Sequence, residues 1–286
     1  MERNTMARVL LGSEVAEAIS LRISGKIDEL GARGITPCLT TVRVGELEDA
    51  IAYERTVTKG AVKAGLEVRN LVLPKEIEQQ TLIDEISRLN CDTGVHGILL
   101  FNPLPKHIDE RAAHDALAPA KDIDGVTTLS HSGVYTGEAL GFAPCTPSAC
   151  MSILDHYGID VAGKHAVVIG RSLVVGKPLA MMLLSRNATV TVCHSKTTDL
   201  ASIARDADIL IACIGRAKMI DAQYLSEGQV VIDVGINVCE DGKIVGDVDF
   251  DTACNIVAAI TPVPGGVGTV TSRILIEHVV DAALKG

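Results

Sequence analysis

The feature that most constrains this chain is an alternation of strand-like and helix-like segments along its whole length. An amphipathic helical pattern, with Ser13 as its expected cap, runs to about Gly34. Extended, β-branched runs then occur at 38–45, 66–73 and 95–101, with helical spacing between them. Because each helix returns the chain to the same end of the sheet, this alternation predicts a β-α-β-α-β unit with parallel strands.

The second half of the chain repeats the alternation after a Gly- and Pro-rich stretch from Gly133 to Pro147. Its strand-like runs are 164–170, 188–194, 207–215 and 229–235. We predict an α/β protein of two domains, one formed by 1–143 plus 270–286 and the other, a Rossmann-like doubly wound domain, by 144–269. The last helical pattern, about 267–284, would then pack back onto the first domain.

Composition excludes several classes of function. A net charge of −10 over 286 residues repels nucleic acid and anionic membranes, and the absence of Trp removes the best stacking platforms for single strands. No apolar run is long enough to cross a bilayer, and the eight cysteines contain no Cys-x-x-Cys pair. We therefore predict a cytoplasmic protein with reduced thiols, no metal site, and neither a nucleic-acid nor a membrane partner.

A glycine-bearing turn follows the first strand of the second half. Gly170 and Gly176 stand six residues apart, with Arg171 and Ser172 between them, and a helical pattern follows. Such a turn lets backbone amides approach a pyrophosphate at the positive end of a helix. Two glycines alone also fit an ordinary strand-to-helix turn, but the order of the surrounding strands favours a dinucleotide site.

The end of the next strand indicates which dinucleotide is bound. An NAD site carries an acidic residue there for the ribose 2′-hydroxyl, whereas this strand ends in His194-Ser195-Lys196. Ser195 and Lys196, together with Arg171, could surround a 2′-phosphate, which favours NADP. The alternative is a solvated basic loop. A Pro- and Gly-rich segment at 261–269, before the last helix, suits a loop lying against a flat ligand.

Together these residues resemble the bifunctional methylenetetrahydrofolate dehydrogenase and methenyltetrahydrofolate cyclohydrolase family, bacterial FolD type. The resemblance covers nearly the whole chain and rests on Val44-Gly45 with Tyr53, Gly97 to Pro105, Lys121-Asp122-Ile123-Asp124-Gly125, Pro144-Cys145-Thr146-Pro147, 170–178, 194–197, Val231 to Asn237, Gly246-Asp247-Val248 and Thr261 to Gly268. It implies two domains with a cleft between them, NADP on the second domain, folate in the cleft, and a homodimer.

The resemblance also assigns residues to each ligand. Tyr53 and Asp124 are implied as catalytic and substrate-binding residues, with Pro264 and Gly265 as further folate contacts. The implied cofactor contacts are Gly170, Arg171, Ser172, Gly176, His194, Ser195 and Ile236.

Two positions depart from the family pattern. The family reads Tyr-x-x-x-Lys, whereas Val57 stands four residues after Tyr53, and Phe101 occupies the place of the glutamine that bonds the lysine. Arg55 and Lys59 lie about 200° and 240° around the helix from Tyr53, so neither simply substitutes. Losing one partner would strand a buried polar group, whereas replacing both with apolar groups is nearly neutral, so the two changes form a coupled replacement.

These departures predict which chemistry survives. Hydride transfer from the methylene bridge needs no base, but ring opening by water needs a positioned proton-transfer group, for which the lysine is the family's candidate. We expect an NADP-dependent methylenetetrahydrofolate dehydrogenase whose cyclohydrolase activity is weak or lost. The alternatives are a fully bifunctional enzyme, a non-catalytic folate- or nucleotide-binding homologue, and a related dehydrogenase acting on another pterin or a small acid.

Overall fold

The computed structural model describes residues 6–286, which form two compact units. The three-stranded unit holds 18–145 and 272–286, and the six-stranded unit holds 6–17 and 146–271. The chain therefore passes between the units at 17/18, 145/146 and 271/272. We predicted boundaries at 143/144 and 269/270, within two residues of the last two passages, but placed the N-terminal segment with the first domain. The two-domain α/β class is confirmed.

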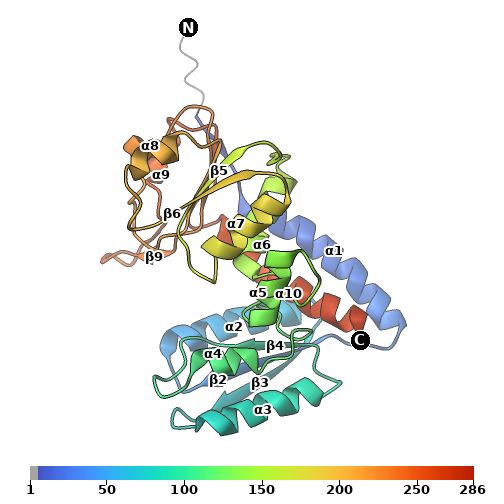
Figure 1. Ribbon diagram of the computed structural model, residues 1–286. Helices are drawn as coiled ribbons and strands as arrows, with labels where there is room; N and C mark the ends of the chain where they lie inside the picture. Colours follow the sequence, from blue (N-terminus) through green and yellow to red (C-terminus); the bar gives the residue numbers. More distant parts are fainter. Residues whose placement is uncertain (1–5) are drawn as a thin grey trace. The chain divides into compact units, whose positions relative to one another are not determined.

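The three-stranded unit is built on a parallel sheet in the order β3-β2-β4. Its strands are β2 (Cys38–Val44), β3 (Glu67–Leu73) and β4 (Gly97–Leu100). The helices that begin within it are α2 (Glu48–Lys63), α3 (Gln79–Cys91), α4 (Glu110–Asp115), α5 (Thr128–Thr136) and α6 (Cys145–His156). Figure 1 shows α2 and α3 on opposite sides of the sheet. The predicted β-α-β-α-β order is confirmed.

The central strand β2 is buried along its entire length, and its two faces differ in chemistry. Val42 packs into an apolar cluster with Leu82 and Ile86 of α3. Thr41 and Arg43, which alternate with Val42 and so point to the other face, both bond to Glu54 of α2. The apolar face anchors α3, and the polar face fixes the position of α2.

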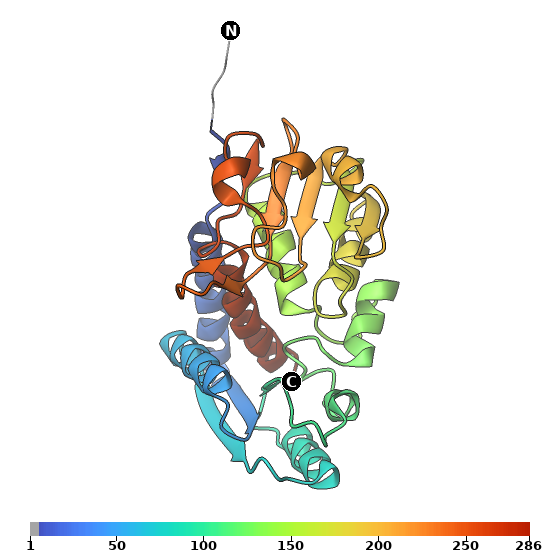
Figure 2. The ribbon, with the colours of Figure 1, turned by 90° about the vertical axis from the view of Figure 1, so that its left-hand side faces the viewer.

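The six-stranded unit is a parallel, doubly wound sheet in the order β1-β11-β8-β7-β5-β6, and Figure 2 shows its strands side by side. The strands are β1 (Arg8–Val9), β5 (His165–Ile169), β6 (Thr189–Cys193), β7 (Ile209–Ala212), β8 (Val230–Asp233) and β11 (Ala259–Ile260). The other elements are α7 (Gly176–Ser185), α8 (Leu200–Arg205), a 3-10 turn η1 (Ala222–Tyr224), the hairpin β9 (Asn237–Val238) and β10 (Ile244–Val245), and α9 (Phe250–Ala253).

Two long helices belong to both units. The first, α1 (Gly12–Ala32), begins one residue before Ser13, so Ser13 lies inside the helix instead of capping it. The second, α10 (Val267–Lys285), matches the predicted last helix. No helix within residues 6–286 has the length and apolar character needed to cross a membrane. All eight cysteines are free, and no group of three or more His, Cys, Asp or Glu side chains in the described chain is placed to hold a metal ion.

The buried pair between Arg43 and Glu54 makes a testable contribution to stability. Their side chains are only 10% and 7% exposed, and Nε of Arg43 lies 2.8 Å from Oε2 of Glu54. Glu54→Gln leaves the guanidinium without its counter-charge, so we expect a loss of about 3–5 kcal/mol in the free energy of unfolding. Urea denaturation followed by circular dichroism measures this loss.

Glu85→Gln is the matched control because it breaks the pair with Arg88, whose side chain is 59% exposed, in α3 of the same unit. We expect a loss below about 1 kcal/mol there. Equal losses in the two variants would contradict the structural role given to Arg43 and Glu54.

Candidate functional site

The predicted glycine turn lies where the six-stranded sheet changes its winding direction. The chain leaves β5 for β6 on one side and then returns to β7 on the other, and ligands of doubly wound sheets bind beyond the carboxyl ends of strands at such a point. A Cβ atom on Gly170 would lie 2.4 Å from the carbonyl oxygen of Cys213, which follows β7. Only glycine therefore fits between the two strand ends, where φ is +134°.

The second glycine brings the start of α7 against this turn. A Cβ atom on Gly176 would lie 2.2 Å from the carbonyl oxygen of Gly170. The turn is closed by Ser172, whose Oγ accepts from the Val175 amide at 3.1 Å and whose carbonyl accepts from the Lys177 amide at 3.0 Å. The exposed turn and the start of the helix form a cradle that fits a pyrophosphate.

The predicted 2′-phosphate contacts are exposed at the end of β6. His194 and Thr197 close this loop through bonds from the His194 amide to Oγ1 of Thr197 (2.9 Å) and from the Thr197 amide to the His194 carbonyl (2.8 Å). Ser195 and Lys196 lie at its exposed tip, and Arg171 is exposed in the glycine turn. No acidic side chain of residues 6–286 forms an ion pair with Arg171 or Lys196. Both positive charges therefore remain available to an anion.

Two buried aspartates that the sequence did not single out organise the remaining loops at this edge. Asp247 accepts from the amides of Ile214 (2.6 Å), Gly215 (3.0 Å) and Arg216 (2.8 Å), which follow β7. It also accepts from Nδ2 of Asn237 at 3.0 Å. Asp247 belongs to the Gly-Asp-Val motif of the resemblance, but nothing in the sequence indicated that its carboxylate binds these amides.

Asp233 is the last residue of β8, and its carboxyl binds the backbone of the loop that carries Asp247. It accepts from the amides of Gly235 (2.9 Å), Asp247 (3.0 Å) and Val248 (2.9 Å). Burial raises the pKa of its carboxyl to about 6. Ile236, a predicted cofactor contact, follows directly and is 65% exposed, so a large apolar side chain is presented at the carboxyl edge of the sheet.

The Pro- and Gly-rich segment after β11 is anchored at both ends. The buried Thr261 accepts from the Asp233 amide at 2.8 Å, and the carbonyl of Gly265 accepts from the Gly12 amide at 2.8 Å. Gly265 has φ of +103°, a backbone conformation that favours glycine. Pro264 and Gly265, the predicted folate contacts, are both exposed on this anchored loop.

In the three-stranded unit, α2 presents Tyr53 next to Phe101. Their ring centroids are 5.7 Å apart with an interplanar angle of 87°, an edge-to-face contact at the carboxyl end of β4. Tyr53 is 43% exposed, yet burial and the negative charge of Asp124 raise the pKa of its hydroxyl well above the usual range. Val57 is 3% and Phe101 5% exposed. Both positions are therefore apolar and buried.

The cations near Val57 in the sequence do not replace a lysine there. Arg55 and Lys59 are exposed and line a surface groove together with Val62 and Asn70. Arg43 is buried, but its guanidinium is bound to Glu54 and to the carbonyl of Gly45. Among these three residues, none offers an unpaired buried cation beside Val57.

Asp124 projects from a turn that Asp122 organises. Oδ1 of Asp122 accepts from the amides of Gly125 (3.0 Å) and Val126 (3.1 Å), and Oδ2 accepts from the Thr127 amide (2.9 Å) and from Oγ of Ser130 (2.7 Å). Burial and the neighbouring Asp122 charge raise the pKa of the Asp124 carboxyl to about 6. Asp124 is thus a carboxyl that changes its charge close to neutral pH.

Cys145 and His278 both bond to the carbonyl of Ile123, the residue before Asp124, and sequence reasoning assigned neither a role. The buried Cys145 thiol donates to this carbonyl at 3.2 Å, and burial raises the pKa of the thiol. Nδ1 of His278 donates to the carbonyl of Ile123 at 2.8 Å and lies 3.7 Å from the Cys145 sulfur. The Pro-Cys-Thr-Pro segment was a visible signal for Cys145, whereas His278 lies in the middle of a helix where no motif marks it.

The fold and these sites define a two-unit α/β protein of the dinucleotide-binding class. Residues 144–286 match the family model for the tetrahydrofolate dehydrogenase/cyclohydrolase NAD(P)-binding domain, and residues 10–124 match the model for its catalytic domain. The chain belongs to the tetrahydrofolate dehydrogenase/cyclohydrolase family.

Individual relatives resemble the chain over nearly its whole length. The bifunctional protein FolD of Clostridioides difficile is 47% identical over 98% of this chain and 97% of its own length. That of Clostridium kluyveri is 48% identical over 97% and 98%. The solved structure of the Campylobacter jejuni FolD superposes with a TM-score of 0.95 at 39% identity, over 98% of this chain and 99% of that one.

A further solved structure contains ligands. The Trypanosoma brucei methylenetetrahydrofolate dehydrogenase-cyclohydrolase, in complex with NADP and an inhibitor, superposes with a TM-score of 0.91 at 35% identity, over 98% of both chains.

The glycine cradle makes a testable prediction. Gly176→Ala places a methyl group against the Gly170 carbonyl, at a strain of about 1–3 kcal/mol, and we expect NADP binding to weaken by about tenfold or more. Isothermal titration calorimetry measures the affinity. Gly25→Ala is the control because no atom beyond the local backbone of α1 lies within 4 Å of that Cβ position, so its NADP affinity should not change. Equal affinities for the two variants would remove Gly176 from the cofactor site.

Proposed function

We propose that this protein is an NADP-dependent methylenetetrahydrofolate dehydrogenase whose cyclohydrolase activity is weak or lost. The observation that carries the proposal is the pair of buried apolar side chains, Val57 and Phe101, the second of which contacts the Tyr53 ring. Tyr53 and Asp124 are the groups we propose for the folate, and the Gly170–Gly176 turn is the one we propose for the cofactor. A homodimeric state and a cytoplasmic location remain predictions.

The cofactor fits the six-stranded unit on physical grounds. A Cβ atom at either Gly170 or Gly176 would fill the cradle, and Arg171 with Lys196 offers unpaired positive charge for a 2′-phosphate. NADP supplies the hydride acceptor when it is bound. The remaining predicted cofactor contacts, Ser172, His194, Ser195 and Ile236, lie at the same edge of the sheet.

The residues of the three-stranded unit would bind and orient the folate. The exposed Tyr53 ring, held edge-on by Phe101, is suited to stack on a pterin. The ionised Asp124 can accept two hydrogen bonds from an aminopyrimidine edge. Pro264 and Gly265 are proposed as further folate contacts. Because hydride transfer needs alignment and no base, these contacts are sufficient for oxidation.

The second reaction requires more than alignment. Water must add to the methenyl carbon and lose a proton, and the ring must then open with proton transfer to nitrogen. Neither Val57 nor Phe101 carries a group that transfers protons. Without such a group the rate falls by about 10²–10⁴-fold, which makes cyclohydrolase turnover weak.

Full bifunctionality is the second candidate, and one observation favours it. With a pKa raised to about 6, Asp124 is partly protonated near neutral pH and could itself transfer a proton. The relatives at 46–48% identity are named as bifunctional proteins. The two candidates differ in whether Asp124 alone supports ring opening.

Separate assays of the two reactions distinguish these candidates. We expect purified protein to reduce NADP with methylenetetrahydrofolate, while the absorbance of added methenyltetrahydrofolate decays only slightly faster than in buffer. The double variant Val57→Lys with Phe101→Gln restores both polar partners, so we expect its cyclohydrolase rate to rise by about 10²-fold.

Val62→Lys adds the same side chain to α2 at a position that is 58% exposed, and it should leave the methenyl decay unchanged. Rapid methenyl decay with the unmodified protein would refute the loss of cyclohydrolase. If Tyr53→Ala abolishes that decay while the double variant leaves it unchanged, the lysine position is irrelevant to this reaction.

The raised pKa of Asp124 predicts a pH dependence for substrate binding. The carboxyl is protonated below about pH 6 and ionised above it, so KM for methylenetetrahydrofolate should fall as the pH rises through this range. Asp124→Asn removes the titrating group, and we expect KM to rise by roughly 10–100-fold and to lose this inflection. Dehydrogenase kinetics between pH 5 and 8 measure both effects. An unchanged inflection in the variant would show that another group causes it.

A further inference from the structure

A pocket of about 470 Å³ lies within the three-stranded unit, at the end of the sheet opposite to Tyr53 and Phe101. It is lined by the end of α3, the residues that lead into β4, segment 139–142 and the end of α10, and we call it the basal pocket. Its volume is typical of pockets that bind small organic molecules. None of the roles described above uses it.

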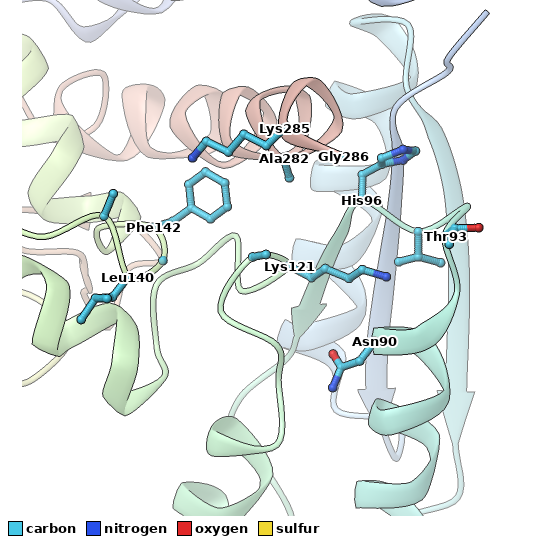
Figure 3. Close-up of a pocket in the computed structure, with 13 residues that line it drawn as sticks. Asn90, Thr93, His96, Lys121, Leu140, Phe142, Ala282, Lys285 and Gly286 are labelled. Carbon is cyan, nitrogen blue, oxygen red and sulfur yellow. The ribbon is translucent and has the colours of Figure 1, made fainter.

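The two ends of the basal pocket differ in chemistry, as Figure 3 shows. Leu140 and Phe142 lie at one end, where Nζ of Lys285 stands 4.8 Å above the centroid of the Phe142 ring. His96, Thr93 and Lys121 lie at the other end. A ligand that fills the pocket would therefore meet an apolar aromatic wall and a set of hydrogen-bond donors.

The polar end offers donors and little acceptor capacity. Nδ1 of His96 accepts from the Cys38 amide at 3.1 Å, which places the proton of the neutral ring on Nε2. Burial and the nearby Lys121 charge lower the pKa of His96, which favours that neutral form. Nζ of Lys121 donates to the carbonyls of Leu89 (3.0 Å) and Asp92 (2.7 Å), so one of its three protons remains.

The charges in this region favour an anion. None of the side chains that line the basal pocket, all within the described residues, is acidic, whereas Lys121 and Lys285 are both cationic. Asp92 contributes its carbonyl to Lys121, but its carboxylate pairs with Arg69 at 3.1 Å. Small organic ligands with one negative charge and an apolar body match this combination of groups.

We propose that the basal pocket binds a small carboxylate with an aromatic or bulky apolar body. The apolar body packs against Phe142 and Leu140, and the carboxylate accepts from Nε2 of His96 and from the remaining proton of Lys121 at the other end of the pocket. This site is independent of the proposed function, because it shares no residue with the proposed folate or NADP contacts.

Direct binding of 2-naphthoate tests the proposal. The protein has no Trp, so the fluorescence anisotropy of the naphthyl group can be followed without strong protein emission. The neutral isostere 2-naphthamide has the same body without the charge. We expect the carboxylate to bind about tenfold more tightly than the amide, since a hydrogen bond between charged groups is stronger than one to a neutral acceptor.

Substitutions identify the site that the probe occupies. Lys121→Gln removes the cation at the polar end and should remove most of the preference for naphthoate over naphthamide, while naphthamide binding against Phe142 and Leu140 should persist. Lys243→Gln is the matched control, because Lys243 is 79% exposed in the six-stranded unit and lies outside the pocket. We expect this control variant to bind both probes as the unmodified protein does.

Further measurements separate this site from the proposed substrate and cofactor sites. Naphthoate affinity should be unchanged by saturating NADP and by Asp124→Asn. The proposal is overturned if naphthoate fails to bind at millimolar concentration, if naphthamide binds equally well, or if Lys121→Gln leaves the preference for naphthoate unchanged. Loss of binding with NADP or in Asp124→Asn would also overturn it, because the probe would then occupy another site. None of these outcomes depends on whether the protein turns over folate.

Discussion

Backbone amides at the carboxyl ends of parallel strands need acceptors, and three buried aspartates supply them throughout this protein. Asp122 accepts from Gly125, Val126 and Thr127, and Asp247 accepts from the amides that follow β7. Asp233 links Asp247 to the end of β8. An unpaired buried amide costs about 1–3 kcal/mol, so these carboxylates determine the loop conformations that carry the ligand-facing residues. Asp124 and Ile236 each lie within two or three residues of one of these aspartates, which bond the backbone of their turns.

Apolar substitution at a polar site can preserve the fold when both partners change together. A lysine at position 57 would require a polar partner in this buried environment, and Phe101 could not provide one. With Val57 and Phe101 present together, no polar atom is left without a bond at these two positions. The three-stranded unit has its buried charge elsewhere, in the pair between Arg43 and Glu54, where Thr41 adds a further hydrogen bond to the carboxylate. The sheet-facing side of α2 thus carries a buried apolar position at Val57 and a buried charge at Glu54.

Much of the fold was predictable because it depends on periodicity. The predicted strand at 38–45 is β2, and those at 66–73 and 95–101 are β3 and β4, each within two residues at its ends. Two-residue strands such as β1 and β11 carry no periodic signal, so only pairing in three dimensions defines them. The glycine turn was recognisable because its residue types have a direct conformational meaning.

The buried residues that hold the ligand-facing loops in position could not be predicted from periodicity. Asp233 lies inside the predicted strand at 229–235 and Asp247 looks like an ordinary turn residue, and their role depends on loops that meet only in the folded sheet. Arg43 would be expected at a surface, since charged residues are rarely buried unless they are paired. His278 and Cys145 lie 133 residues apart, and no pattern along the chain connects them.

The six-stranded sheet ends on one side in two residues from the beginning of the chain. Arg8 and Val9 of β1 pair with Ala259 and Ile260 of β11, and the Leu10 amide continues the contact to the Ile260 carbonyl at 2.8 Å. Trimming the first ten residues, as in a shortened expression clone or after proteolysis, would uncover the outer side of β11. An uncovered parallel edge offers a template to the strands of other molecules, so the N-terminal segment protects this sheet from self-association.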